Sequence, residues 1–142
     1  MATSLEVMDA LAVQLAAELA TIDGLQAHGR VVWNPTPPCV DIYPAEPFQE
    51  PFGMGVGNNT LFLTVRARVN TPDYEGAQDL LLQMMDMDGA YSVEQAIEAD
   101  KTLGGVVGQV LVLSGPSEFG AFVDPGGSAL LGCTWRVQVV PA

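Results

Sequence analysis

The first twenty residues have the hydrophobic spacing of an amphipathic helix. Their apolar residues recur three and four positions apart, as along one helical face: Leu5, Met8, Ala12, Leu15 and Leu19. Thr3 and Glu6 occupy the two positions of a capping box, in which each side chain bonds the other residue's backbone. Asp23-Gly24 is a pair that ends helices. The pattern predicts a helix over residues 4–22.

Two later segments alternate between apolar and polar residues, as strands with one buried face do. Every second residue of 61–69 is apolar, and the polar positions between them include Arg66 and Arg68. Residues 132–140 alternate in the same way, with Arg136 among the polar positions. If these strands are neighbours, the three arginines form a patch on one face of the sheet. The alternative is a solvent-facing side on which each arginine is paired with a nearby acid.

Two helical segments lie between these strands. Thr71-Pro72-Asp73 is an N-cap followed by proline at the first helical position, and its helix runs to about Met85. The apolar residues of this helix extend beyond one face: Tyr74, Ala77, Leu80, Leu81, Leu82, Met84 and Met85. So broad an apolar surface has to be covered by the rest of the fold or by a neighbouring chain. Ser92-Val93-Glu94-Gln95 matches a second capping box and predicts a short helix to about Asp100.

The other strand signals are short. Residues 31–33 and 40–43 flank a proline cluster, and residues 106–113 and 119–123 indicate a strand pair around Ser114-Gly115-Pro116. Strands and helices are grouped rather than strictly alternating. This order favours an α+β fold, in which an N-terminal helix and two central helices pack on a mostly antiparallel sheet. A length of 142 residues fits a single domain over residues 1–142.

Residues 44–60 have no periodicity and are expected to form an extended contact loop. The segment from Pro44 to Asn59 holds three prolines, three glycines and the large apolar residues Phe48, Phe52 and Met54. Long loops without secondary structure are uncommon in compact domains and are usually functional or mobile. We expect this loop to become ordered against a partner; the alternative is a flap folded over its own domain.

The charge is strongly one-sided, with 17 acidic against 5 basic residues and a net charge of −12. This balance disfavours binding to a nucleic-acid backbone, which needs clustered Lys and Arg, and it disfavours anionic membranes. One interpretation of the negative charge is an ordinary solvated acidic surface. The more specific interpretation is a surface that repels a polyanion. The N-terminus lacks the basic region of a signal peptide, so we expect the chain to fold in a cytoplasm.

Residues that could carry catalysis or bind metal are few. His28 is the single histidine, no nucleophile motif is present, and Cys39 and Cys133 are far apart in the sequence. Buried free thiols are favoured for the two cysteines, although their even count leaves a disulfide open. Gly53–Gly57 leads into a strand rather than a helix, and Asp86–Gly89 lacks the later ligands of a calcium loop. We therefore expect no enzyme activity, no metal site and no cofactor.

Four segments together resemble a known class of proteins. They are Gly29-Arg30-Val31-Val32-Trp33-Asn34-Pro35, Asp41-Ile42-Tyr43-Pro44, Thr64-Val65-Arg66-Ala67-Arg68-Val69 and Gly132-Cys133-Thr134-Trp135-Arg136-Val137. Their layout is similar to that of small tail-terminator or head–tail joining proteins of long-tailed actinobacterial phages. The resemblance implies a virion protein that forms a ring, commonly a hexamer, caps the tail tube and provides the docking surface for the head.

The resemblance also implies partners and contact residues. The partners would be further copies of the chain, the tail-tube protein and a head-completion or connector protein, with DNA passing through unbound and no membrane involved. The candidate contact residues are Phe48, Phe52, Met54, Arg66, Arg68, Leu82, Met85 and Arg136. One alternative is a head-completion or stopper protein of the neck. Another, from a different class, is a cytosolic module that binds a small molecule or peptide.

Overall fold

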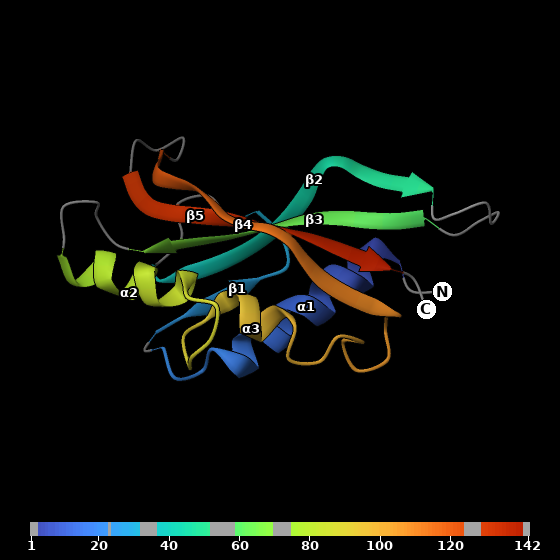
Figure 1. The fold of residues 1–142 in the computed structure, drawn as a ribbon, viewed down its shortest axis with the longest axis horizontal. Helices are drawn as coiled ribbons and strands as arrows, with labels where there is room; N and C mark the ends of the chain where they lie inside the picture. The colour runs from blue at the N-terminus through green and yellow to red at the C-terminus, as the bar shows by residue number, and fades with distance from the viewer. Residues whose placement is uncertain are drawn as a thin grey trace.

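The computed structural model describes residues 3–22, 24–31, 37–51, 59–69, 75–123 and 129–140, with backbone alone at 47–51, 59 and 75. Its elements are α1 (Ser4–Glu18), β1 (Gln26–His28), β2 (Cys39–Pro51), β3 (Asn59–Val69), α2 (Glu75–Met85), α3 (Val93–Ile97), β4 (Gln109–Val123) and β5 (Ala129–Val140). The five strands form one sheet in the order β1-β2-β3-β5-β4, and β1–β2 is its parallel pair (Figure 1). The prediction of an α+β fold with a mostly antiparallel sheet is confirmed.

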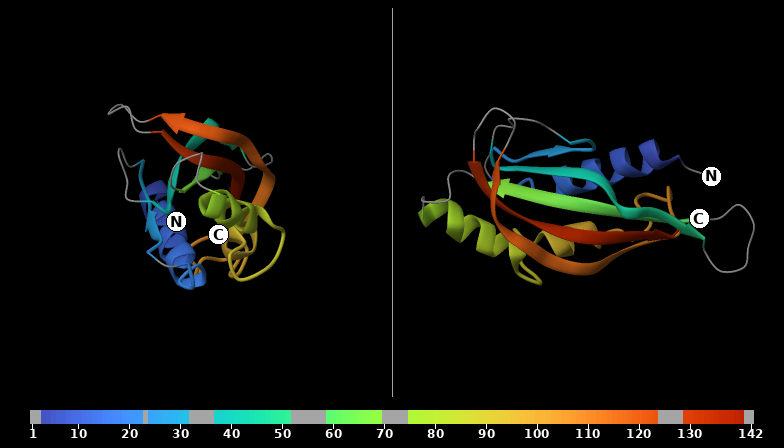
Figure 2. Two further views of the ribbon diagram at one scale, coloured as in Figure 1. Left: turned by 90° about the vertical axis from the view of Figure 1, so that its left-hand side faces the viewer. Right: turned by 90° about the horizontal axis from the view of Figure 1, so that it is seen from above.

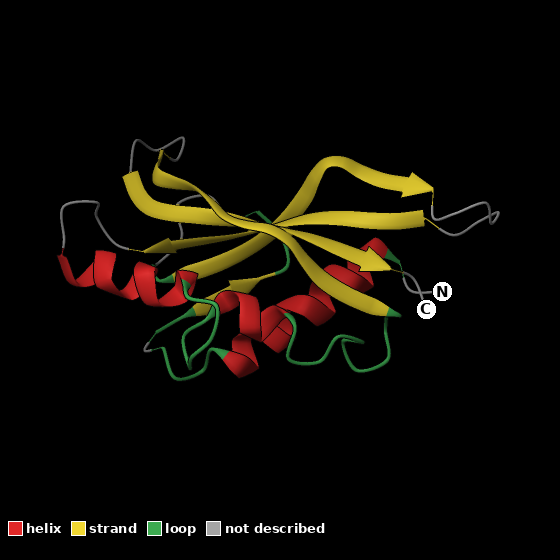
Figure 3. Ribbon diagram, in the orientation of Figure 1, coloured by secondary structure: helices red, strands yellow, loops and turns green. Residues whose placement is uncertain are grey.

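The helices lie on one side of the sheet, which we call the helix face (Figure 3). The apolar side chains of the strands meet those of α1 and α2 there and form a continuous core. Its fully buried members include Leu11, Leu15, Val40, Ile42, Leu63, Val65, Leu81, Met84, Trp135 and Val137. No helix of the described chain covers the opposite side, which we call the open face. The sheet is twisted, so that β4 crosses the end of β5 when it is seen along its length (Figure 2).

Both predicted capping boxes mark real helix starts. Thr3 Oγ1 accepts a hydrogen bond from the Glu6 backbone N–H at 3.1 Å, and Ser92 Oγ accepts one from the Gln95 N–H at 3.1 Å. Helix α1 ends at Glu18, before the predicted end at residue 22. Ile22 is nevertheless buried, because the chain turns after the helix and still directs this residue into the core.

Three predictions of local structure were wrong. Residues 44–51 belong to β2 rather than to a loop, because a register shift between Pro44 and Gln49 lets this proline-containing segment stay paired with β3. Val31, the first residue of the predicted strand at 31–33, is not in a strand, and the short strand β1 with His28 lies before it. The two predicted strands at 106–113 and 119–123 are parts of one strand, β4, which pairs with β5 on both sides of Gly115 through three register shifts.

Some predicted features cannot be placed. Phe52, Met54 and the N-cap at residues 71–73 lie outside the described residues. Phe48 lies in β2, in the stretch where the register shifts.

Gly132 of β5 occupies a position that has no room for a side chain. A Cβ atom there would lie 2.4 Å from the Ala67 carbonyl oxygen and 3.1 Å from Arg68 Cγ. Gly120 of β4 is paired with Gly132 across the two strands, yet a Cβ atom there would meet nothing within 4 Å. The two paired glycines thus differ in the space around them.

This difference predicts opposite outcomes for two matched substitutions. Gly132→Ala should lower the free energy of unfolding by about 1–3 kcal/mol, because the methyl group forces β3 and β5 apart. Gly120→Ala should change it by less than about 0.5 kcal/mol. Urea denaturation followed by tryptophan fluorescence measures both. Equal effects of the two substitutions would contradict this account of the packing.

Candidate functional site

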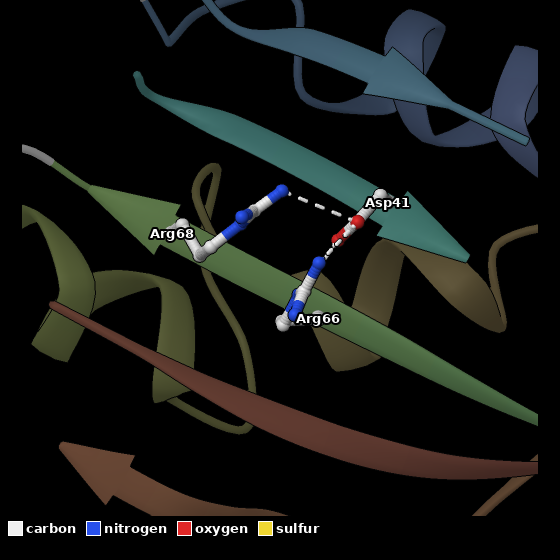
Figure 4. Close-up of polar contacts among 3 residues, drawn as sticks. All are labelled: Asp41, Arg66 and Arg68. Atoms are coloured by element: carbon white, nitrogen blue, oxygen red, sulfur yellow. Dashed lines mark hydrogen bonds and ion pairs between the residues drawn. The ribbon is translucent and has the colours of Figure 1, made fainter. Parts of the chain in front are cut away.

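The open face carries a buried cluster of three charged side chains, Asp41 of β2 and Arg66 and Arg68 of β3 (Figure 4). Arg66 donates two hydrogen bonds to the carboxylate, from Nε to Oδ1 at 3.1 Å and from Nη2 to Oδ2 at 2.6 Å. Arg68 Nη2 donates to Oδ2 at 3.3 Å. Asp41 and Arg68 are fully buried, and the Arg66 side chain is 12% exposed. A single carboxylate therefore joins two guanidinium groups inside the fold.

Aromatic rings flank the cluster. The Arg66 guanidinium lies 5.2 Å from the centre of the Tyr43 ring and 5.6 Å from that of Phe122. Burial raises the pKa of the Tyr43 hydroxyl, while the positive charge of Arg66 opposes the shift. The rings limit access of water to the ion pairs, and this strengthens their electrostatic attraction.

The three arginines predicted to share a sheet face do so, because β3 and β5 are neighbours and Arg136 is paired with Thr64. Arg66 and Arg68 are also paired with an acid, Asp41, as the alternative prediction expected. Arg68 is buried inside the subunit and is not part of a surface that a partner could touch. No sequence pattern pointed to Asp41, because its pairing depends on the register between β2 and β3.

Arg136 is held differently from the other arginines. Its Nη1 donates to the Glu46 carbonyl oxygen at 3.0 Å, and its guanidinium lies 4.7 Å from the centre of the Phe62 ring. Arg30 is paired with Asp9 at 3.0 Å, as Arg66 and Arg68 are with Asp41. Arg136 is thus the one arginine to which the described residues supply no carboxylate.

A groove of about 420 Å³ crosses the open face beside Arg136. Its sides come from β2 and β4 and its floor from β3 and β5. The lining is mainly polar: Tyr43, Glu46, Thr64, Ser114, Ser117, Glu118, Thr134 and Arg136. A hydrogen bond between the Ser117 and Thr134 side chains, at 3.3 Å between the oxygens, holds β4 against β5 along the groove.

The backbone of β4 is irregular where it borders the groove. Glu118 has a φ of 58°, in the left-handed region that few non-glycine residues adopt. Gly115 has a φ of 122°, and a Cβ atom there would lie 2.9 Å from the Thr134 carbonyl oxygen. The register shifts of β4 all lie between Val112 and Gly120. Bulges and backbone strain often occur together at functional sites, and here they shape one side of the groove.

Two groups of exposed apolar side chains lie at the end of α2 and along β4. After the buried Leu81 and Met84 of α2, Leu82 is 52% exposed and Met87 81% exposed, while Met85 is partly buried against the core. The broad apolar surface predicted for this helix is therefore only partly covered by the described chain.

The second place is β4, whose Leu113, Phe119 and Val123 are 47%, 51% and 70% exposed. Sequence reasoning missed them, because it predicted a strand pair here without assigning its place in the sheet. The absence of any polar alternation in Phe119-Gly120-Ala121-Phe122-Val123 was a usable signal for an unusual edge.

Within the described residues, no three His, Cys, Asp or Glu side chains are grouped to hold a metal ion. Among the same residues, no helix is long and apolar enough to cross a membrane. His28 is in β1, and its Nε2 is buried with no hydrogen-bond partner among the described residues. Cys39 and Cys133 are buried free thiols, as predicted.

Comparison with known proteins adds no relative. No protein-family model matches the chain, and no curated protein is significantly similar to it. The resemblance to phage tail-terminator and head–tail joining proteins therefore stands on the quoted sequence segments.

The Asp41 cluster predicts a large loss of stability on neutralisation. Asp41→Asn leaves two arginines without their carboxylate, one of them fully buried, and should lower the free energy of unfolding by about 3–5 kcal/mol. Asp9→Asn removes the exposed partner of Arg30 and should cost less than about 1 kcal/mol. Chemical denaturation of the two variants provides the comparison. A cost for Asp41→Asn as small as that of Asp9→Asn would show that the cluster contributes little.

The buried thiols predict how stability depends on pH. Burial raises the pKa of Cys133 to about 12; it also raises that of Cys39 to about 11, where Arg68 partly opposes the shift. A thiol in the unfolded chain ionises at about pH 8.5. The contribution of a buried, protonated thiol to the free energy of unfolding is therefore complete below that pH and is lost as the pH rises toward the pKa of the folded state. Above about pH 9, the unfolding free energy of the wild type should fall more steeply than that of Cys133→Ala, by about 1.4 kcal/mol per pH unit. Parallel curves for the two proteins would refute the shift.

Proposed function

We propose that this protein is a virion subunit that forms a ring, most simply a hexamer, at the head–tail junction of a long-tailed phage. In this proposal the ring caps the tail tube and provides the docking surface for the head. Its partners are further copies of itself, the tail-tube protein and a head-completion or connector protein. The family resemblance of the sequence supports this function, and the outer edge of β4 is the structural observation that carries it.

The edge of β4 is divided into a closed and an open part. Near its start, the outward N–H groups are used within the subunit: Val110 donates to the Lys101 carbonyl oxygen at 2.8 Å and Val112 to Glu98 Oε2 at 2.9 Å. From Leu113 to Val123, no backbone hydrogen bond to any described residue lies on the outer side. An open edge with exposed apolar side chains is a template for pairing with another chain.

The exposed Leu82 and Met87 are further apolar side chains that a neighbouring subunit would cover in this proposal. The net charge of −12 suits a channel wall along which DNA slides without sticking. The alternative of a ligand-binding module with a lid at 44–59 has less support, since residues 44–51 belong to strand β2.

Paired valine substitutions test whether the β4 edge is an assembly contact. Val123 of β4 and Val13 of α1 are both 70% exposed, so Val123→Asp and Val13→Asp should leave the fold equally stable. We expect Val123→Asp to reduce ring formation at least about tenfold, because it places a charge in an apolar contact, and Val13→Asp to leave it unchanged. Analytical ultracentrifugation across a concentration series measures the effect.

The function itself is tested on particles. Wild-type protein should bind the ends of isolated tails that lack a terminator and restore their ability to join DNA-filled heads, scored as infectious particles. Copurification with tails supports the terminator, whereas copurification with filled heads assigns the protein to the stopper or head-completion position. A protein that stays monomeric and binds neither tails nor heads would refute a role in the neck.

A further inference from the structure

The arrangement around Arg136 is that of a receptor for a carboxylate. In a chain with 17 acidic residues, the other three arginines are each paired with Asp9 or Asp41. Arg136 instead rests on the Phe62 ring and donates one hydrogen bond to the Glu46 carbonyl oxygen. Both contacts fix the plane of the guanidinium, and the described residues use one of its five N–H groups. The other N–H groups of the guanidinium are already oriented, so that binding a carboxylate costs little side-chain entropy.

The groove beside Arg136 offers a further hydrogen-bond donor, because Ser114 of β4 lines it. The hydroxyl groups of Ser117 and Thr134 are already bonded to each other across β4 and β5. Arginine forms its strongest hydrogen bonds with carboxylates and phosphates, which it can bind through two parallel N–H groups. Carboxylate groups of Glu46 and Glu118 also line the groove, and these repel the high charge density of a polyanion such as DNA. A single carboxylate side chain fits this mixture of charges better than a phosphate backbone does.

We propose that the groove at Arg136 receives an aspartate or glutamate side chain of a neighbouring copy of this chain. This inference rests on the proposed ring, in which each subunit has an identical neighbour. Charge complementarity identifies the occupant: a copy with 12 more acids than bases presents carboxylates in excess, and Arg136 is a base that forms no ion pair with the described residues of its own subunit. The contact is heterologous, with groove and acid on different surfaces, as a closed ring requires.

Charge reversal at two basic positions tests the contact. Arg136→Glu should weaken association between subunits at least about tenfold, since it places two like charges in one groove. Lys101→Glu makes the same change of net charge at an exposed side chain and should alter association less than about threefold. Arg136→Lys keeps the charge but loses the planar fork, so its effect should be intermediate. Sedimentation velocity at low and moderate salt gives the association constants, and circular dichroism checks that each variant is folded.

A crosslinking experiment identifies the acid. Lys101 is the one lysine of the chain, so the double variant Lys101→Arg, Arg136→Lys carries a single side-chain amine, located in the groove. A zero-length carbodiimide reagent joins an amine to a carboxylate that it touches. We expect covalent dimers and larger species, with a crosslink from position 136 to one Asp or Glu of the other copy in the peptide mass spectrum. Lys101→Arg alone, whose remaining amine is the N-terminus, is the control.

The outcomes separate this inference from the proposed function. If the wild type forms rings and Arg136→Glu forms them equally well, the contact is wrong while the ring stands. The same conclusion follows if position 136 crosslinks only to the tail-tube protein, or only within its own subunit. If the wild type remains monomeric at all concentrations and does not cap tails, both proposals fail.

Discussion

The carboxylate of Asp41, shared between Arg66 and Arg68 inside the fold, is the interaction on which the arrangement of the sheet depends. A buried charge is costly unless an opposite charge and hydrogen bonds compensate for it. The cluster meets this condition in one register of β2 against β3, since a shift by one residue would turn Asp41 toward the helices. The ion pairs thus select a register that the apolar alternation of both strands also favours.

This register gives the sheet two unlike faces. On the helix face, Val40, Ile42 and Val65 pack in an apolar core under the helices. On the open face, no described helix packs over the charge cluster, and the rings of Tyr43 and Phe122 lie against the Arg66 guanidinium instead. The groove beside Arg136 on the same face is lined mainly by polar side chains. A sheet with one free face and one partly open edge has surfaces left for other chains.

Assembly of such a chain has to overcome electrostatic repulsion. Subunits with a net charge of −12 repel one another over roughly the Debye length, about 8 Å at physiological salt. Association then depends on a few contacts that are strong at short range. In the proposed ring, the exposed apolar residues of β4 would be buried between subunits, and Arg136 would supply a positive charge at a defined point. The same negative charge that opposes assembly would keep DNA from sticking to a completed ring.

The sequence by itself determined the features that depend on near neighbours in the chain. The N-caps at Thr3 and Ser92, the alternation of β3 and β5 and the shared face of Arg66 and Arg68 follow from spacing within a few residues. The continuity of β4 and the length of β2 were decided by the tertiary structure, because strand pairing with β5 and β3 outweighed local signals of Pro and Gly. The partner of each arginine was decided in the same way. Asp41 is 25 positions from Arg66 in the sequence, and only the pairing of their strands brings the two side chains together.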